Sequence, residues 1–341
     1  MFHSQATFSL WRQLLLALVM LLGFTATSCD DDEDDTPPPA AAKNIVQVAQ
    51  ANPDFSSLVA AVVKADLATT LSGTGPFTVL APTNAAFAQM PAPFNTAASI
   101  TAISDPAQIT ALKNILLYHA LPGSKKAADF PTGASAQTTA KPASAMGVND
   151  NTVYASKTGS AITLNGTTRV VTADVAASNG VIHAIDKVLI PPTGKISDIV
   201  VASTTAATPQ FTLLLQALQR PAASALLTAA ASNSSNVTVF APTDAAFRTL
   251  LTDLSLTSLS QVPDATLVAV LQLHVVGSRA FSSDLVSGPV TTLGGPVTVG
   301  VNGSAVTVRG AGNGTSNASV VTANILATNG VIHVIDRVLR P

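Results

Sequence analysis

The chain contains the same ordered set of sequence blocks twice, and this internal duplication constrains its fold more than any other feature. The blocks read Thr-Val-(Leu/Phe)-Ala-Pro-Thr-(Asn/Asp)-Ala-Ala-Phe, then Leu-x-(Tyr/Leu)-His, then Asn-Gly-Val-Ile-His-x-Ile-Asp-x-Val-Leu. They occupy residues 78–87, 116–119 and 179–189 of the first copy and residues 238–247, 271–274 and 329–339 of the second. The offset between matching blocks falls from 160 to 155 to 150 residues. Fixed blocks with unequal insertions between them are typical of two homologous domains whose loops differ.

Helical periodicity comes first in each copy, and strand signals follow. Apolar residues recur at helical spacing upstream of the first block, at Phe55, Leu58, Val59 and Val62 and at Phe211, Leu214, Leu215 and Leu218. The first block itself predicts a buried strand that ends at Pro and enters a helix capped by Thr. Helices followed by strands favour an α+β fold over alternating βαβ units.

The second half of each copy predicts β-hairpins. Val and Thr alternate on both sides of Asn302-Gly303, a pair typical of two-residue hairpin turns. We expect the looser counterpart of this hairpin in the first copy where residues 161–164 precede Asn165-Gly166.

Composition supports two packed domains without a nucleic-acid partner. The chain has 341 residues and is 47% hydrophobic and 11% charged, which is enough apolar material for two cores. Six of the 19 acidic residues lie in the run Asp30–Asp35, so the body carries 13 acidic and 16 basic side chains. Lys125-Lys126 is the only adjacent basic pair. Nucleic-acid binding needs a concentrated basic face, which this pattern does not provide.

The first 28 residues resemble an export signal. Arg12 precedes the apolar stretch 14–24, and the small residues 26–28 follow. Cys29, the only cysteine, stands where bacterial lipoprotein signals place the residue that is lipidated. Ordinary cleavage after Ser28, leaving a free thiol, is the alternative. With one cysteine the protein has no internal disulfide.

Residues 29–43 are predicted to be a tether. The acidic run and the prolines Pro37–Pro39 favour a solvated, extended spacer. The run also resembles the acidic sequence that follows the lipidated cysteine in Bacteroidetes lipoproteins of the outer face of the outer membrane. We therefore expect an exported protein of the cell envelope, held at the outer membrane by an N-terminal lipid and exposed at the surface.

Together the three blocks resemble the fasciclin domain, with one copy in residues 44–192 and another in residues 195–341. The resemblance implies two tandem domains, each a β-sheet wedge flanked by α-helices. It also implies a role in cell adhesion, matrix attachment or extracellular protein interaction. The family's Tyr-His motif falls on Tyr118 and His119, whereas the second copy has Leu273 before His274. Tyr118, His119 and His274 are thus the candidates for partner binding, with the first copy as the main binding site and the second as a spacer or support.

The closing block supplies His183 and Asp186 in the first copy and His333 and Asp336 in the second, and we interpret all four as structural. The same placement in both copies and the lack of close metal-ligand spacing favour this interpretation. The alternative is a metal pair of His119 and His183, with Asp174 or Asp186 as a third ligand. We predict no metal and no cofactor.

The sequence offers no catalytic motif. Glu33 is the only glutamate, so the zinc-protease pattern His-Glu-x-x-His cannot occur, and there is no Gly-x-Ser-x-Gly elbow. We therefore predict a non-enzymatic adhesion or protein-binding module at the cell surface, with an extracellular protein or matrix component as partner. The alternatives are a periplasmic or extracellular small-molecule or polymer-binding protein and a polymer-degrading hydrolase that uses a pair of aspartates.

Overall fold

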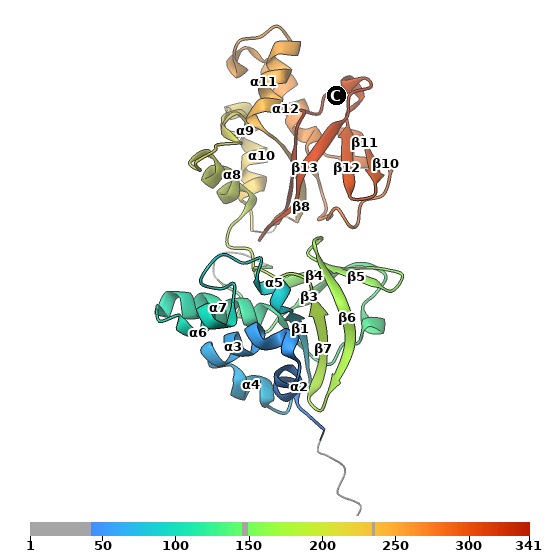
Figure 1. Ribbon diagram of the computed structural model, residues 1–341. Coiled ribbons are helices and arrows are strands. Elements are labelled where there is room, and N and C mark those ends of the chain that lie inside the picture. The colour runs from blue at the N-terminus through green and yellow to red at the C-terminus, as the bar shows by residue number, and fades with distance from the viewer. Residues whose placement is uncertain (1–41, 145–148, 234–235) are drawn as a thin grey trace, which may run out of the picture. The chain divides into compact units, whose positions relative to one another are not determined.

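The computed structural model describes residues 42–144, 149–233 and 236–341. The unit from Ala42 to Pro341 contains both sequence copies, and each copy forms a seven-stranded sheet with helices packed against it (Figure 1). This architecture confirms the predicted α+β wedge. Cys29 and the leader lie outside the described residues. No helix in the described ranges is both long enough and apolar enough to cross a membrane.

The first domain begins with helices and ends with strands. Its helices are α2 (Ile45–Ala51), α3 (Ser56–Lys64), α4 (Ala68–Ser72), α5 (Asn84–Phe87), α6 (Ala97–Ala102) and α7 (Pro106–Tyr118). Its strands are β1 (Phe77–Pro82), β2 (Ala120–Pro122), β3 (Gly133–Thr138), β4 (Thr152–Thr158), β5 (Ala161–Leu164), β6 (Thr168–Ala177) and β7 (Gly180–Ile185).

The second domain repeats this order. Its helices are α8 (Ile196–Thr204), α9 (Thr212–Leu218), α10 (Ser224–Ala231), α11 (Asp244–Asp253) and α12 (Asp264–Leu273). Its strands are β8 (Val237–Pro242), β9 (Val275–Val276), β10 (Gly288–Thr292), β11 (Gly295–Asn302), β12 (Ala305–Arg309), β13 (Ala318–Ala327) and β14 (Gly330–Ile335).

The two sheets have the same topology. The strand order is β2-β1-β7-β6-β5-β4-β3 in the first domain, and β9-β8-β14-β13-β12-β11-β10 is its equivalent in the second. β1 and β7 are parallel, as are β8 and β14, and the other neighbours are antiparallel. The register places Leu80 opposite His183 and Phe240 opposite His333. The first and third blocks of each copy are thus neighbouring strands at the centre of the sheet.

The strand-to-helix turn forms as its sequence predicts. The Thr83 hydroxyl accepts a hydrogen bond from the backbone N–H of Ala86 at 3.2 Å, and Thr243 does the same for Ala246 at 3.2 Å. Each Thr therefore caps the helix that follows Pro, satisfying a donor that the first turn leaves free.

An asparagine ties the two ends of each domain together. The side-chain oxygen of Asn179 accepts from the N–H of Ile45 at 2.9 Å, and its amide donates to the carbonyls of Leu71 and Gly73 at 2.9 and 2.8 Å. Asn329 makes the equivalent contacts in the second domain, accepting from Ile196 at 2.9 Å. The adjacent Gly180 has φ +154°, and a Cβ there would lie 1.9 Å from the Phe77 carbonyl oxygen. In the closing block, the asparagine therefore joins distant segments through its side chain, and the glycine allows the backbone of β1 to come close.

The counterpart of the second-domain hairpin differs from the one that the sequence predicts. β11 and β12 form the predicted hairpin, with Asn302 opposite Ala305. Its counterpart is the β4–β5 hairpin, which turns at Gly159 with Thr158 opposite Ala161. Asn165-Gly166 instead joins β5 to β6. An Asn-Gly pair marks a tight turn but carries no information about which strands of a meander it joins.

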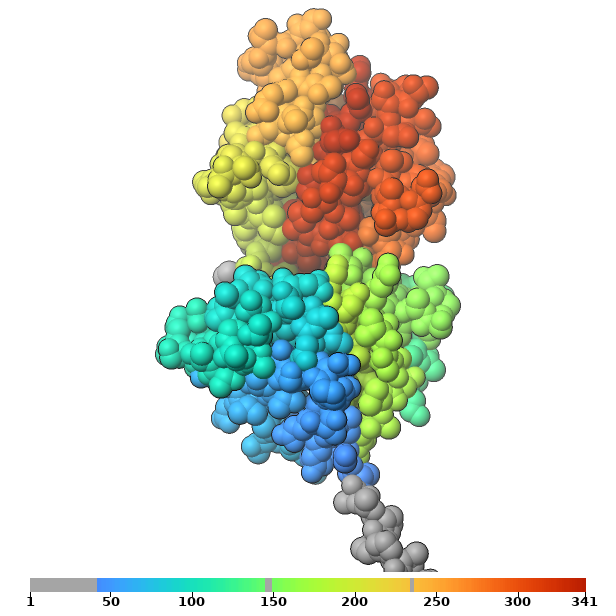
Figure 2. All heavy atoms as spheres, viewed as in Figure 1, coloured from blue at the N-terminus to red at the C-terminus, as the bar shows by residue number. Residues whose placement is uncertain are grey.

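Each sheet separates two clusters of buried apolar residues. In the first domain Val79, Ala81 and Ile182 face the helices, whereas Leu80 and Ile185 face the interior of the folded sheet. This alternation follows from the two-residue period of a strand. Figure 2 shows the surface of the first domain, where the early helices in blue and teal lie on one side and the exposed strand β6 in yellow-green lies on the other.

Candidate functional site

Tyr118, the first candidate for partner binding, lies in the interior of the first domain. Its side chain is 0% exposed, at the C-terminal end of α7. The hydroxyl donates to the Thr152 carbonyl oxygen at 2.6 Å and accepts from the Asn165 side-chain amide at 3.3 Å. Burial raises the pKa of this hydroxyl, against a smaller opposing effect of the Asn165 hydrogen bond. In this structure the ring is not available to a partner.

His119 is also buried, and both of its ring nitrogens are used. Nε2 accepts a hydrogen bond from the Leu189 N–H at 2.9 Å, so the proton lies on Nδ1 and is donated to the Ile115 carbonyl at 2.7 Å. Burial lowers the pKa of His119 to about 4, although the Ile115 hydrogen bond opposes the shift. The neutral ring therefore joins the end of α7 to the segment that leaves the domain.

His274 occupies the same position in the second domain. It donates to Val270 at 2.8 Å and accepts from the Leu339 N–H at 3.0 Å, and burial lowers its pKa to about 4 as well. Leu273, which replaces the tyrosine, is buried and provides no hydroxyl. In the first copy both residues of the Tyr-His motif make internal hydrogen bonds. In the second copy only the histidine does. Partner binding through Tyr118, His119 or His274 remains a prediction, and in this structure it would act through the segments that they hold.

The closing histidines form a second matched pair of ties. Nε2 of His183 donates to the Lys125 carbonyl at 2.8 Å, and Nδ1 accepts from the Asp174 N–H at 3.2 Å. His333 donates to Ala280 at 3.0 Å and accepts from the Asn324 N–H at 3.3 Å. Burial lowers the pKa of His333. Each ring therefore connects its central strand to a β-bulge and to the loop after the Tyr/Leu-His block.

The closing aspartates are more exposed and bind the backbone. A carboxylate oxygen of Asp186 accepts from the Arg169 N–H at 2.7 Å, and Asp336 accepts from the Ser319 N–H at 2.7 Å. Each aspartate holds the start of the long strand, β6 or β13, beside the end of the closing strand.

The segments held by Tyr118 continue to a contact with the second domain. Tyr154 lies two residues after Thr152, and its ring centroid is 5.6 Å from that of Phe281. Gly166 lies one residue after Asn165, and its carbonyl accepts from the Asn324 side chain at 2.9 Å. Tyr118 thus supports two points at which the first copy meets the second.

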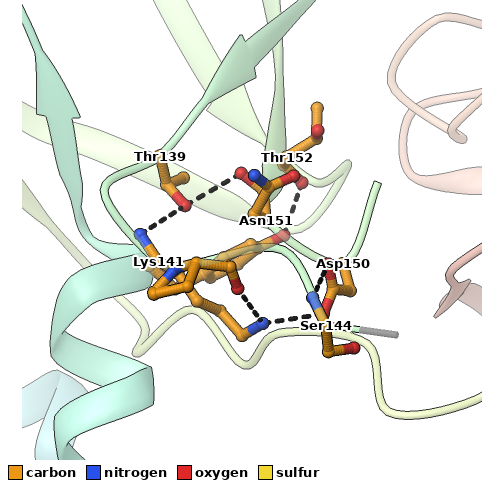
Figure 3. A network of polar contacts seen from close by, with 8 residues as sticks. Thr139, Lys141, Ser144, Asp150, Asn151 and Thr152 are labelled. Carbon is orange, nitrogen blue, oxygen red and sulfur yellow. Dashed lines mark hydrogen bonds and ion pairs between the residues drawn. The ribbon is translucent and has the colours of Figure 1, made fainter. Parts of the chain in front are cut away.

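An ion pair that the sequence did not predict joins the start and the end of the β3–β4 connection (Figure 3). The Lys141 ammonium is 2.8 Å from a carboxylate oxygen of Asp150, and both side chains are buried. Burial alone would raise the pKa of Asp150, but hydrogen bonds from Lys141 and Ser144 outweigh it and hold the pKa below its usual value. The pair also lines a depression of about 850 Å³ beside Ile190–Thr193, counted with its part open to solvent.

The described residues do not assemble the alternative metal site. Both ring nitrogens of His119 and both of His183 are hydrogen-bonded to backbone groups. Within the described ranges no three His, Cys, Asp or Glu side chains are grouped so as to hold a metal ion.

Comparison with known proteins gives the same picture of two copies. The family model of the fasciclin domain matches residues 53–191 and 209–341. The Synechocystis protein sll1483 is 43% identical over 151 residues, 44% of this chain and 75% of that protein. Transforming growth factor-beta-induced protein ig-h3 of Sus scrofa is 36% identical over 152 residues, 45% of this chain but only 20% of that protein. Human periostin is 28% identical over 302 residues, 87% of this chain and 31% of periostin.

Among solved structures, a FAS1 domain pair from the insect cell adhesion molecule fasciclin I is 19% identical, with a TM-score of 0.37 over 83% of this chain and 92% of that one. The assignment rests on the sequence matches, which cover both copies and most of the chain. The chain belongs to the fasciclin domain family and carries two tandem fasciclin domains.

Proposed function

We propose that this protein is a non-enzymatic adhesion or protein-binding module at the cell surface. The observation that carries the proposal is the match of both copies to the fasciclin domain, since this domain is found in cell adhesion proteins. Its partner is an extracellular protein or a matrix component.

In this proposal the first domain is the main binding site. Tyr118 and His119 contribute to binding indirectly, by holding the segments that carry the binding surface. Tyr118 and His119 hold the strand around Thr152 and the chain at Leu189, so they fix the surface loops from inside. The second domain lacks the tyrosine and serves as a spacer or support.

The proposal places the protein on the outer membrane through a lipid on Cys29, with residues 29–43 as a spacer. The small residues before the single cysteine and the acidic run after it support this part. Mass spectrometry of the mature N-terminus tests it. We expect an acylated Cys29 as first residue; an unmodified N-terminus would remove the lipid anchor from the proposal and leave adhesion to be tested alone.

The adhesion test compares cells with and without the gene for binding to matrix-coated surfaces and to neighbouring cells. We expect deletion to reduce attachment, the intact gene to restore it, and a gene lacking residues 195–341 to restore part of it. Unchanged attachment on deletion would refute adhesion. In that case the alternatives, a small-molecule or polymer-binding protein and a polymer-degrading hydrolase, are separated by whether the purified protein releases products from a polymer.

A further inference from the structure

The sequence contains five Asn-Gly pairs, and the fold leaves one of them in a different chemical situation from the other four. The pairs begin at Asn165, Asn179, Asn302, Asn313 and Asn329. In such a pair the main-chain nitrogen of the glycine can attack the side-chain amide carbon of the asparagine, because glycine has no Cβ to hold that nitrogen away. The attack is favoured where both groups are free to approach each other. The surroundings of each pair therefore decide its reactivity.

Three of the pairs have a buried asparagine whose side-chain oxygen and nitrogen are both hydrogen-bonded. The oxygen of Asn165 accepts from the Tyr154 N–H at 2.9 Å, and its nitrogen donates to the Tyr118 hydroxyl at 3.3 Å. Asn179 and Asn329 each accept one hydrogen bond from a backbone N–H and donate two to backbone carbonyls. Each of these side chains has to break its hydrogen bonds before the amide carbon can turn toward the glycine nitrogen.

Asn313 is only half-buried, but its amide is used as fully. Its oxygen accepts from the N–H groups of Gly310 and Arg340 at 3.1 and 2.9 Å, and its nitrogen donates to the Val338 carbonyl at 2.9 Å. These contacts join the β12–β13 connection to the segment after β14. The fourth pair is thus held by hydrogen bonds instead of burial.

Asn302 ends β11 at the tip of the β11–β12 hairpin, where its side chain is exposed. Among the residues that the structure describes, no hydrogen bond is made by this side chain or by the N–H of Gly303. Gly303 has φ +60°, and a Cβ built on it would meet no atom within 4 Å. Both reacting groups are therefore free to move, and water has access to them.

We propose that Asn302-Gly303 is a site of spontaneous modification, at which the asparagine is converted to aspartyl and isoaspartyl residues. The main-chain nitrogen of Gly303 forms a bond to Cγ of Asn302. The bond from Cγ to Nδ2 breaks, and Nδ2 leaves as ammonia with the proton of the attacking N–H. Water then opens the resulting cyclic imide. Opening at Cγ gives the aspartyl residue, and opening at the main-chain carbonyl carbon gives the isoaspartyl residue. Water is the only co-reactant.

The modification changes both the charge and the main chain of the hairpin tip. Either product replaces a neutral amide by a carboxylate. The isoaspartyl product also lengthens the main chain by one carbon atom, at the position where Asn302 pairs with Ala305. Since the turn sets the register of a hairpin, we expect the pairs nearest the tip to loosen. The buried Val306 and Val308 hold the rest of β12 in the core. The second domain therefore gains negative charge as the protein ages, independently of adhesion.

The first domain provides matched variants, because its β4–β5 hairpin has the same turn. Thr158 lies opposite Ala161 there, as Asn302 lies opposite Ala305. In both hairpins Gly-Ser follows, and the glycine has φ +60°. Asn302→Thr thus copies a sequence that already forms this turn but has no amide. Thr158→Asn places an Asn-Gly pair in the exposed turn of the first domain.

The test incubates the purified protein at pH 7.5 in heavy-oxygen water and follows every Asn-Gly pair by peptide mass spectrometry. We expect loss of the amide with uptake of one heavy oxygen at Asn302. Its rate should exceed that of the other four pairs at least about ten-fold, which corresponds to about 1.4 kcal/mol of activation free energy. Asn302→Thr should remove this reaction, and Thr158→Asn should add a second reacting site of similar rate. Circular dichroism should show that both variants are folded.

Unfolding separates the effect of the fold from that of the sequence. In guanidinium chloride no pair keeps its hydrogen bonds, so all five should react at similar rates. Similar rates for the five pairs in the folded protein would overturn the proposal, as would a folded-state Asn302 that stays unmodified while the unfolded chain reacts. A folded Thr158→Asn variant without reaction at its new pair would also contradict it, because the exposed turn would then not be sufficient.

Discussion

The guanidinium carbon of Arg279 lies 4.5 Å from the centroid of the Tyr154 ring, so a cation of the second domain rests on an aromatic face of the first. The same guanidinium donates to the carbonyls of Gly330 and Ala327 at 2.6 and 3.2 Å, and to the Asn236 side chain at 2.7 Å. Arg279 therefore closes the β13–β14 turn and contacts the neighbouring domain at once. Burial lowers its pKa, against smaller opposing effects of the two tyrosines.

Arg279→Met should destabilise the protein by about 3 kcal/mol, because it leaves several buried carbonyl groups without a donor. Tyr154→Leu should cost less, about 1–2 kcal/mol beyond its packing, because it removes the cation–π contact with Arg279 and the aromatic contact with Phe281. Urea denaturation gives both values. Arg248→Met is the control, since Arg248 is exposed on α11. A loss for Arg279→Met no greater than that for Arg248→Met would contradict the assigned role.

Tyr118→Phe should cost about 1–3 kcal/mol, because it leaves the buried Thr152 carbonyl and Asn165 amide without their hydroxyl partner. Tyr154→Phe is a matched control, since the Tyr154 hydroxyl makes no hydrogen bond to any residue of the described ranges. We expect it to change the free energy of unfolding by less than about 0.5 kcal/mol. Near-UV circular dichroism should retain the native signal in both variants. Equal effects of the two substitutions would argue against the Tyr118 tie.

Acid should destabilise both domains over the pH range in which unfolded histidine takes up a proton. The folded-state pKa values of His119 and His274, about 4, lie below the unfolded value of 6.5, so the unfolded state binds protons first as the pH falls. Stability is therefore greatest above pH 6.5 and is lost as the pH falls toward 4. At about 1.4 kcal/mol per pKa unit, each histidine contributes a loss of about 3 kcal/mol.

The measurement is a denaturation series from pH 7.5 to 4.5, with the ring proton shifts of both histidines followed by NMR. Neither ring should titrate above pH 5 in the folded protein. A histidine that titrates near 6.5 in the native state would contradict the double hydrogen bonding of its ring.

Lys141→Met should destabilise the first domain by about 3–5 kcal/mol, because it leaves the Asp150 carboxylate buried without its cation. The double variant Lys141→Met/Asp150→Leu should recover part of this loss, since it removes both charges. A double-mutant cycle in urea gives the coupling between the two groups. Asp264→Asn provides the comparison, because the Arg220–Asp264 pair is more exposed and we expect a cost of about 1 kcal/mol or less. Simple additivity of Lys141→Met and Asp150→Leu would show that the pair is not coupled.

The sequence predicts those helices and strands that follow from local periodicity and from the repetition of the blocks. The helix of Phe55, Leu58 and Val62 and the strand that ends at Pro82 follow from spacing and capping signals within about ten residues. The positions of Tyr118 and Arg279 do not, because their partners are reached only through the folded sheet. The Lys141–Asp150 pair could not be predicted either, because nothing in the sequence marks these two charged residues as partners in the fold. In a chain with only 11% charged residues, each charged residue of the β3–β4 connection could still have been considered as a member of an ion pair. Comparison of the two copies was the one source of long-range information in the sequence, and it showed that Leu273 replaces the tyrosine of the first copy.

The tie between Asn179 and Ile45 gives the first domain a mechanical property. Ser178 also donates to the Lys43 carbonyl at 2.9 Å, so the chain entering the domain is fastened at two adjacent points to the turn before β7. Tension applied through residues 29–43 would reach β7 directly, without first unwinding α2. Because β7 lies at the centre of the sheet between β1 and β6, such a load would be shared by two neighbouring strands. A domain fastened in this way resists pulling from its N-terminus until its central strands begin to separate.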